Sequence, residues 1–206
     1  MSSLHRIYVT ICRLRASWGF GVHSPNVYGL LTDVLRERRP YYAYESIERL
    51  SSAAGRDGCS VRVNKLLFRL VNRFRPEHVL EVGDGDGCGR ACMSMARRAT
   101  SVSVMDEKAK DISTSRLTVE LGEGRKIGFL HITQTAAFRE IYEAALPLVD
   151  EKSLFIIEGV RLTKEMCAWW KQVEQDARTG ITIDLYDVGL VFFDRKCPRR
   201  NYRFNL

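Results

Sequence analysis

The chain has 206 residues, of which 45% are apolar, and this is enough for the core of one domain of ordinary size. It contains no run of ~18 apolar residues, and its first twenty residues lack the apolar core of a signal peptide, so we expect neither a transmembrane helix nor a secretory leader. The six cysteines contain no C-x-x-C pair and predict reduced thiols in a cytoplasmic protein, while the net charge of +7 favours an anionic partner or substrate.

The first part of the chain is predicted to be mostly helical. Residues 4–18 place large apolar side chains on one helical face, namely Leu4, Ile7, Tyr8, Ile11, Leu14 and Trp18. Membrane-surface helices have such a stripe, but we expect the more ordinary outcome, in which the helix packs on the domain. Ser24 and Pro25 then begin a second helix, because serine caps a helix and proline suits its first position. Pro40 ends this helix.

Two further helices are predicted before the first strand. One runs to about Ser52, and the other covers residues 63–74, where apolar residues recur at helical spacing. We therefore expect residues 1–75 to form a helical extension that packs on a core formed by residues 76–206.

The segment 78–94, HVLEVGDGDGCGRACMS, is the one around which the rest of the chain is organised. An apolar run ending at Val82 predicts a buried strand, and the Ala-, Met- and Arg-containing end predicts a helix. Between them stand Gly83, Gly85 and Gly87. Glycines allow a tight turn and a close approach to a ligand, and the helix N-terminus offers unpaired N–H groups. The pattern is typical of a nucleotide-binding α/β unit, although a plain glycine-rich loop produces the same spacing.

After this unit the sequence continues to alternate between strands and helices. The predicted elements are a strand at 78–82, a helix at 87–98, strands at 101–106 and 126–132, a helix at 135–146, a strand at 153–158, a helix at 163–177 and two antiparallel strands within 181–193. Residues 107–125 are too few for a full helix, strand and helix, so we expect a missing or vestigial unit there, with a short strand at 117–121 as the alternative. We also expect residues 190–193 to form a buried strand that is integral to the sheet.

An acid before the glycines distinguishes this motif from a dinucleotide fingerprint. The sequence E-x-G-x-G-x-G, which begins at Glu81, resembles the first motif of the class I S-adenosylmethionine-dependent methyltransferases. Asp84 and Asp86 would repel a phosphate, whereas the sulfonium and ammonium groups of S-adenosylmethionine tolerate or favour acids. The resemblance implies that the cofactor site is lined by Glu81, Gly83, Gly85 and Gly87.

The resemblance also implies a second acid, at the end of the next strand, that holds the ribose hydroxyls. Asp106 stands there, 25 residues after Glu81, close to the ~20 of the analogous acid in dinucleotide folds. Taken alone, Asp106 could equally be a solvated or helix-capping carboxylate. Its pairing with the glycine motif favours the cofactor site.

Longer stretches resemble one uncharacterised branch of class I methyltransferases with helical N-terminal extensions. They are GFGVHSPNVYGLL, YYAYESIERL, the glycine motif, LTKEMCAWWKQV, and ITIDLYDVGLVFFD followed by YRF. The resemblance implies an α/β, Rossmann-like class I methyltransferase fold, in which a mostly parallel sheet ends in an antiparallel hairpin. It also implies S-adenosylmethionine as the cofactor and methyl transfer as the activity.

The departures from this branch fall where the chemistry would occur. Its members usually carry an F-I-D-G-N-H-like motif at the end of the fourth strand and a D-D-I-H-W-like motif after the fifth, where this chain has FLHITQ at 129–134 and IEGVRLT at 157–163. Glu158 alone remains as a carboxylate ligand, and a hard cation needs several oxygens, so we expect no metal. Cys88 and Cys92 lie four residues apart without a histidine, and we interpret them as buried side chains rather than metal ligands.

His131 is the candidate catalytic base. Methyl transfer needs an aligned acceptor and removal of the acceptor's proton, and His131 stands near the carboxyl end of a central strand, where ligands bind in such sheets. A purely structural hydrogen bond is the alternative for His131. His23 and Glu158 are weaker candidates. We expect His23 to be a packing or loop residue and Glu158 to form a salt bridge with an arginine such as Arg161.

Three functions are consistent with the sequence. The first is a metal-independent methyltransferase whose acceptor, small or macromolecular, stays unnamed because acceptor pockets in this fold are built from variable loops. The second is a pseudoenzyme that retains the fold for binding or scaffolding, since the departures predict weak or lost catalysis. The third is a nucleic-acid-binding protein that uses a basic C-terminal patch, although we favour a solvated strand there. This patch comprises Arg195, Lys196, Arg199, Arg200 and Arg203, with Tyr202 and Phe204 among them.

Overall fold

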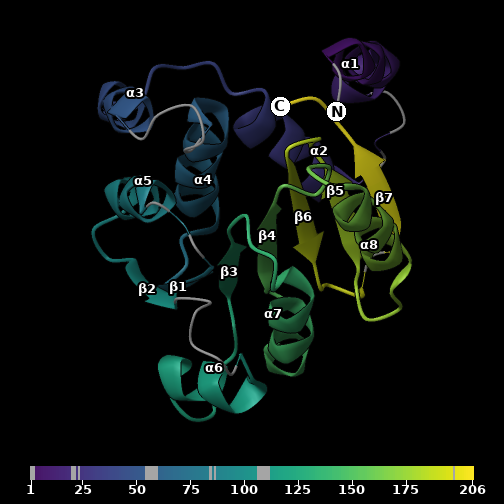
Figure 1. The fold of residues 1–206 in the computed structure, drawn as a ribbon. Coiled ribbons are helices and arrows are strands. Elements are labelled where there is room, and N and C mark those ends of the chain that lie inside the picture. Colours follow the sequence, from purple (N-terminus) through teal and green to yellow (C-terminus); the bar gives the residue numbers. More distant parts are fainter. Residues whose placement is uncertain are drawn as a thin grey trace.

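A seven-stranded sheet lies between two layers of helices (Figure 1). The computed structural model describes residues 3–19, 22, 24–53, 60–83, 85, 87–105, 112–196 and 198–206. The strands are β1 (His78–Val82), β2 (Ser101–Met105), β3 (Phe129–Ile132), β4 (Leu154–Glu158), β5 (Ile181–Asp184), β6 (Val188–Phe192) and β7 (Arg200–Arg203). All the strands expected between residues 78 and 193 are confirmed, although β3 begins later than expected.

The strand order across the sheet is β2-β1-β3-β4-β6-β5-β7. The pairs β1/β2, β1/β3 and β3/β4 are parallel, whereas β6 runs antiparallel to both β4 and β5. Strands β1 to β5 therefore all end at the same edge of the sheet, which we call the carboxyl edge. This arrangement confirms the expected mostly parallel sheet with a C-terminal antiparallel hairpin.

The connection between β2 and β3 lacks a strand within the described residues 112–128. It contains a helix, α6 (Thr114–Leu121), so the expected shortened unit is confirmed and the alternative of a short strand at 117–121 is wrong. Leu117 and Leu121 are buried four residues apart, while Val119 between them is 82% exposed. That is the helical period, because a strand would place all three side chains on one face.

The remaining helices cover both faces of the sheet. They are α1 (Ser3–Ser17), α2 (Pro25–Leu30), the π-helix η1 (Leu31–Leu35), α3 (Tyr44–Ala53), α4 (Val61–Phe74), α5 (Cys88–Ala96), α7 (Phe138–Ala145), the 3₁₀ helix η2 (Leu146–Leu148) and α8 (Lys164–Gln175). The side chains of α2 to α5 form a first core with one face of the sheet, and those of α6 to α8 form a second core with the other face. The Ser24 hydroxyl accepts a hydrogen bond from the Val27 amide, which confirms the predicted cap of α2.

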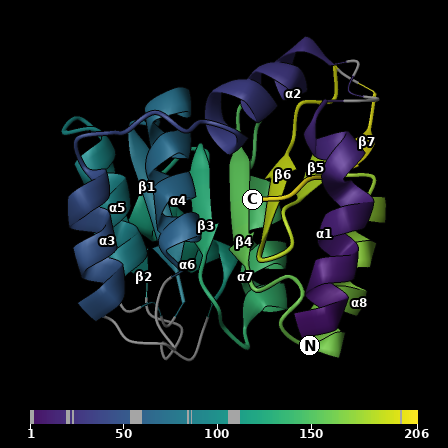
Figure 2. The same cartoon turned by 90° about the horizontal axis from the view of Figure 1, so that it is seen from above.

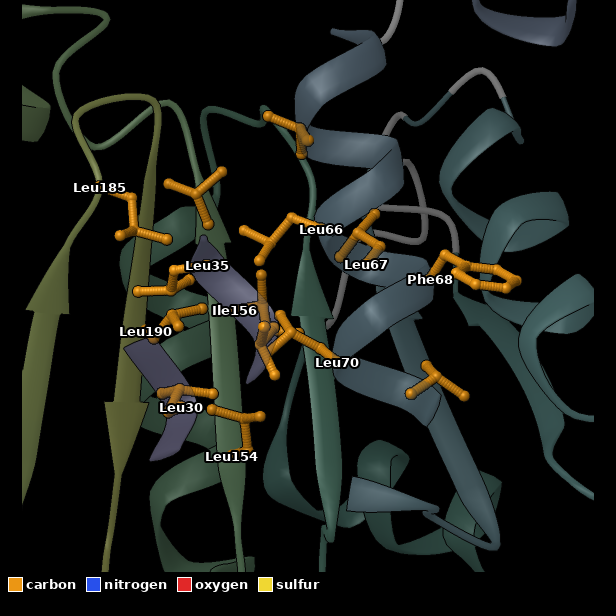
Figure 3. Close-up of a cluster of buried hydrophobic side chains, with 14 of the residues drawn as sticks. Leu30, Leu35, Leu66, Leu67, Phe68, Leu70, Leu154, Ile156, Leu185 and Leu190 are labelled. Atoms are coloured by element: carbon orange, nitrogen blue, oxygen red, sulfur yellow. The ribbon is translucent and has the colours of Figure 1, made fainter. Parts of the chain in front are cut away.

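The first core is built on the apolar stripe of α4. Leu66 and Leu70 project from this helix toward Leu154 and Ile156 of β4 (Figure 3). The helical spacing that predicted α4 thus reflects its contact with the sheet. The proposed division of the chain at residue 75 stays a prediction, and helices α2 to α4 share one core with the strands.

The C-terminal segment is an integral part of the sheet. Leu190, Val191 and Phe193 are buried, as expected, although β6 ends at the half-buried Phe192. Strand β6 lies between β4 and β5. Tyr202 of β7 and Phe204 after it are also buried in the first core. These two aromatic rings therefore face the protein interior and are not exposed for stacking on nucleic-acid bases.

Helix α1 lies beside β7 in both views of the molecule (Figures 1 and 2). It contacts the domain through polar side chains, among them Arg13, and leaves the apolar side chains of Ile7, Tyr8, Ile11 and Leu14 exposed. Helix α1 therefore contacts the domain through Arg13, which pairs with the buried carboxylate of Asp184, rather than through its apolar side chains. No helix in the described part of the chain is both long and apolar enough to cross a bilayer.

Candidate functional site

The glycine turn joins β1 to α5 at the carboxyl edge. Gly83 and Gly87 have φ angles of +125° and +78°, which L side chains rarely adopt. A Cβ atom on Gly83 would lie 2.2 Å from the Thr133 hydroxyl oxygen, and one on Gly85 would lie 3.0 Å from the Thr133 methyl carbon. The turn therefore packs directly on the end of β3, and only glycine permits that approach.

Three titratable side chains meet beneath this turn. Glu81 of β1 and His131 of β3 are register partners on neighbouring parallel strands, so their side chains emerge side by side. The His131 Nδ1 atom lies 2.9 Å from a Glu81 carboxylate oxygen. The His131 Nε2 atom lies 3.0 Å from a carboxylate oxygen of Glu158, at the end of β4. We call Glu81, His131 and Glu158 the imidazole triad.

The imidazole triad holds a buried positive charge between two negative ones. Burial by itself would lower the pKa of His131, but the hydrogen bonds to Glu158 and Glu81 outweigh it and raise this pKa to about 9. His131 is 1% exposed, and both of its ring nitrogens contact carboxylates. At neutral pH the imidazolium donates both N–H groups, and the triad has a formal charge of −1 when both carboxylates are ionised.

The N-terminal turn of α5 covers the triad. A Cβ on Gly89 would lie 3.1 Å from both a Glu81 carboxylate oxygen and the His131 Cε1 atom, and 3.4 Å from a methyl carbon of Leu67. Gly89 thus brings the helix backbone against the triad, while Leu67 of α4 closes it from the side of the first core. Glu158 keeps 15% of its side chain exposed and is the member of the triad with most access to solvent.

The salt bridge expected between Glu158 and Arg161 is wrong, because Arg161 belongs to a second ionic cluster. Its Nε atom lies 3.1 Å from the Asp184 carboxylate, and Arg13 of α1 lies 3.0 Å from the same carboxylate oxygen. Asp184 is fully buried. Burial would raise the pKa of Asp184, but the hydrogen bond from Arg161 and the charges of both arginines outweigh it and lower that pKa. We call Arg13, Asp184 and Arg161 the guanidinium cluster.

Sequence reasoning missed both ionic groupings, although it singled out His131, Glu81 and Glu158 individually. Asp184 stands within an alternating strand segment. An acid that faces inward in a strand needs a cationic partner, and this was the signal in the sequence for the guanidinium cluster. Asp106 and His23 lie outside the described residues, as do Asp84 and Asp86. The expected absence of a metal stays a prediction, and no group of three or more His, Cys, Asp or Glu suited to a metal ion occurs in the described ranges.

A cavity of about 1040 Å³ lies at the opposite edge of the sheet. Its lining includes the first residues of five strands, namely His78, Ser101, Phe129, Leu154 and Ile181. These residues mark the amino ends of β1 to β5, so a ligand in this cavity would not contact the glycine turn. The cavity is therefore not part of the candidate site.

Comparison with known proteins identifies the fold. The sequence matches no family model, and no curated protein matches it. A methyltransferase from Podospora anserina bound to SAH is 10% identical, with a TM-score of 0.54 over 83% of this chain and 96% of that one. An O-methyltransferase from Bacillus cereus in complex with SAH is 16% identical, with a TM-score of 0.51 over 81% and 97% of the two chains. A methyltransferase from Geobacter sulfurreducens is 14% identical, with a TM-score of 0.54 over 83% and 98%. The chain therefore has the class I methyltransferase fold.

Proposed function

We propose that this protein binds S-adenosylmethionine at the carboxyl edge and transfers its methyl group to a small-molecule acceptor without a metal. One observation carries the proposal. The glycine turn lies on a buried triad of net negative charge, at the edge of the sheet where ligands bind in open α/β folds. Two of the proteins with similar structures hold SAH, the demethylated form of this cofactor.

The residues at this edge fit such a cofactor in shape and in charge. Gly83 and Gly85 let the turn pack on Thr133, whereas a Cβ on Gly87 would meet only the Arg90 guanidinium, at 3.8 Å, so the backbone at Gly87 can approach a ligand closely. The triad has a negative formal charge, which attracts the sulfonium and ammonium groups of S-adenosylmethionine. We assign the ribose contact to Asp106, as expected from the sequence. The bound cofactor would supply a methyl group on a reactive sulfonium leaving group, so the protein's task is mainly alignment.

In this proposal His131 is a positioning residue rather than the catalytic base. An imidazolium whose two N–H groups are donated to Glu81 and Glu158 has no lone pair with which to accept a proton from the acceptor. It instead fixes the two carboxylates and offsets one of their charges. The imidazolium is itself a cation, and it lies between the two carboxylates that could otherwise bind a metal ion. This arrangement supports a metal-independent reaction.

Cofactor binding is tested by thermal unfolding with S-adenosylmethionine and S-adenosylhomocysteine. Saturation at ~100 times the dissociation constant should stabilise the protein by about 2.7 kcal/mol. Gly85→Val should abolish the shift, because its side chain would meet Thr133 and displace the turn. Gly128→Val is the matched control, since no atom lies within 4 Å of a Cβ at Gly128, which stands at the opposite edge. No shift in the wild type, or equal shifts in both variants, would refute the proposal.

The enzyme and pseudoenzyme functions are distinguished by methyl transfer from labelled cofactor to a small-molecule extract. The blocked nitrogens of His131 are the observation that favours the pseudoenzyme, because they remove from the reaction the base expected from the sequence. Labelling that requires Gly85 supports the enzyme, and binding without labelling supports a binding or scaffolding protein. The pH profile then tests the role of His131. A rate that rises through pH 9 indicates that His131 is the base, whereas a rate that falls there indicates the positioning role.

A further inference from the structure

Helix α1 presents an apolar surface that the domain does not cover. It comprises Ile7, Tyr8, Ile11, Leu14 and Trp18, whose exposed fractions range from 46% to 67%. Ile7, Ile11, Leu14 and Trp18 recur at helical spacing and form one continuous stripe. Tyr28 of α2 extends the stripe at its end, because its ring would lie 3.0 Å from a Cβ on Gly19. An exposed apolar surface of this kind marks an interaction site.

Buried polar contacts fix the orientation of this surface. Arg13 donates hydrogen bonds to the backbone carbonyls of Asp184 and Phe204 at 3.2 Å and pairs with the buried Asp184 carboxylate. Asn205 donates to the Ser17 hydroxyl through its backbone and to the Thr10 carbonyl through its side chain. Rolling α1 inward would remove Arg13 from Asp184 and leave a carboxylate buried without this partner. The apolar stripe is therefore held outward by the polar face of the same helix.

The charge around this surface is positive. Residues 3–32 contain no Asp or Glu, the next acids are Asp33 and Glu37 on either side of Arg36 in the sequence, and the whole chain has a net charge of +7. The Arg36 guanidinium lies 5.0 Å from the centre of the Trp18 ring, is exposed, and has no ion pair within the described residues. Asp187, which lies near the start of α1, pairs with Arg6. A second copy of the chain would bring an equally basic surface against this one, whereas an anionic surface would complement it.

We propose that α1 docks on the surface of an anionic lipid membrane, with its apolar stripe inserted at the level of the headgroups. Helices that bind in this way bury an apolar face by ~5–10 Å and carry basic residues beside it. Tryptophan and tyrosine suit this interface, because one end of each ring system is apolar and the other forms hydrogen bonds. Helix α1 lies beside β7 on one side of the molecule, and helix α5, which follows the glycine turn, lies on the opposite side (Figure 2).

The experiment is co-sedimentation of the full-length protein with vesicles of phosphatidylcholine alone and of phosphatidylcholine mixed with phosphatidylserine. We expect binding to the mixed vesicles that weakens as salt is added. The tryptophan emission should shift to the blue on binding, and Trp18→Phe should remove the shift. Trp18 is 65% exposed, whereas Trp169 and Trp170 are already buried, so only Trp18 can change its surroundings in this way.

Two control variants on α6 distinguish a loss of docking from the general effect of adding negative charge to the protein. Ile11→Asp should weaken vesicle binding by a factor of about ten or more, because it loses the burial of a large apolar side chain and adds a negative charge. Val119→Asp places the same charge at an exposed apolar position of α6 and should leave binding unchanged. Arg36→Glu should weaken binding, and Arg116→Glu, also on α6, should not. Binding to neither vesicle, equal loss in the matched variants, or self-association that Ile11→Asp abolishes without vesicle binding would each overturn the proposal.

Discussion

The imidazole triad and the guanidinium cluster are opposite solutions to burying charge at the same edge of one sheet. In the triad a cation, His131, lies between two carboxylates, and in the cluster an anion, Asp184, lies between two guanidinium groups. They also lie on opposite faces. His131 shares its face with Phe129 of the first core, whereas Asp184 alternates with Ile183, which belongs to that core. Each pairs charges that would be costly to bury alone.

The difference between them lies in what each can change. The central group of the triad titrates near pH 9, whereas the guanidinium groups of the cluster stay charged throughout the range in which proteins fold. The triad also joins neighbouring strands, whereas the cluster joins α1 to the C-terminal hairpin across 171 residues of sequence. The triad is therefore suited to a site that responds to its ligand, and the cluster to holding the architecture.

Asp184→Asn should have the largest effect on folding. The variant keeps an oxygen that accepts the Tyr186 amide but leaves Arg13 and Arg161 without the charge that compensates their burial. Breaking a buried ion pair in this way costs about 3–5 kcal/mol of unfolding free energy. Urea unfolding at neutral pH measures it.

Asp187→Asn is the matched control for Asp184→Asn. Asp187 stands in the turn that follows Asp184, and its salt bridge with Arg6 is partly exposed, with 50% of the Arg6 side chain and 31% of the Asp187 side chain accessible to solvent. Exposed pairs contribute about 0.2–1 kcal/mol. Equal losses in the two variants would show that the guanidinium cluster has no special structural role.

The pH dependence of stability should report the imidazole triad, with an effect somewhat smaller than that of Asp184→Asn. The folded-state pKa of His131, about 9, lies above the ordinary value of 6.5. The triad's contribution is therefore fully present below pH 6.5 and is lost as the pH rises through 9. This difference corresponds to about 3 kcal/mol. Chemical unfolding between pH 6 and 10 measures it, and subtracting the curve of His131→Gln removes the contributions of other groups. Parallel curves for the two proteins would contradict the raised pKa.

The same two clusters show how much the sequence could predict. Apolar alternation and glycine spacing are local signals, and they were sufficient for β1, the glycine turn and the order of strands and helices. The partner of Glu158 could not be predicted from local signals. Arg161 is close in sequence, but the parallel register places His131 beside Glu81 and within reach of Glu158 instead. The outward orientation of α1 likewise depends on Asp184, a residue at the far end of the chain.

Glu158→Gln should have a smaller effect on stability than Asp184→Asn or the change of pH. It should also show which carboxylate of the imidazole triad raises the pKa of His131. The amide oxygen can still accept the hydrogen bond from His131 Nε2, so the variant removes a charge and little else. Glu158 is also the triad member with most access to water, and water already screens part of its interaction. We therefore expect a loss of about 1 kcal/mol at neutral pH, the difference between a hydrogen bond to a charged group and one to a neutral group. The pKa of His131 should fall below 9, because one of the two groups that raise it has lost its charge. A titration of the His131 ring followed by NMR measures this pKa directly.

Glu81→Gln provides the comparison, since Glu81 is the more deeply buried carboxylate and its charge is less screened. A pKa that stays near 9 in Glu158→Gln but falls in Glu81→Gln would mean that Glu81 alone holds the proton on His131, and that Glu158 is available to face a ligand.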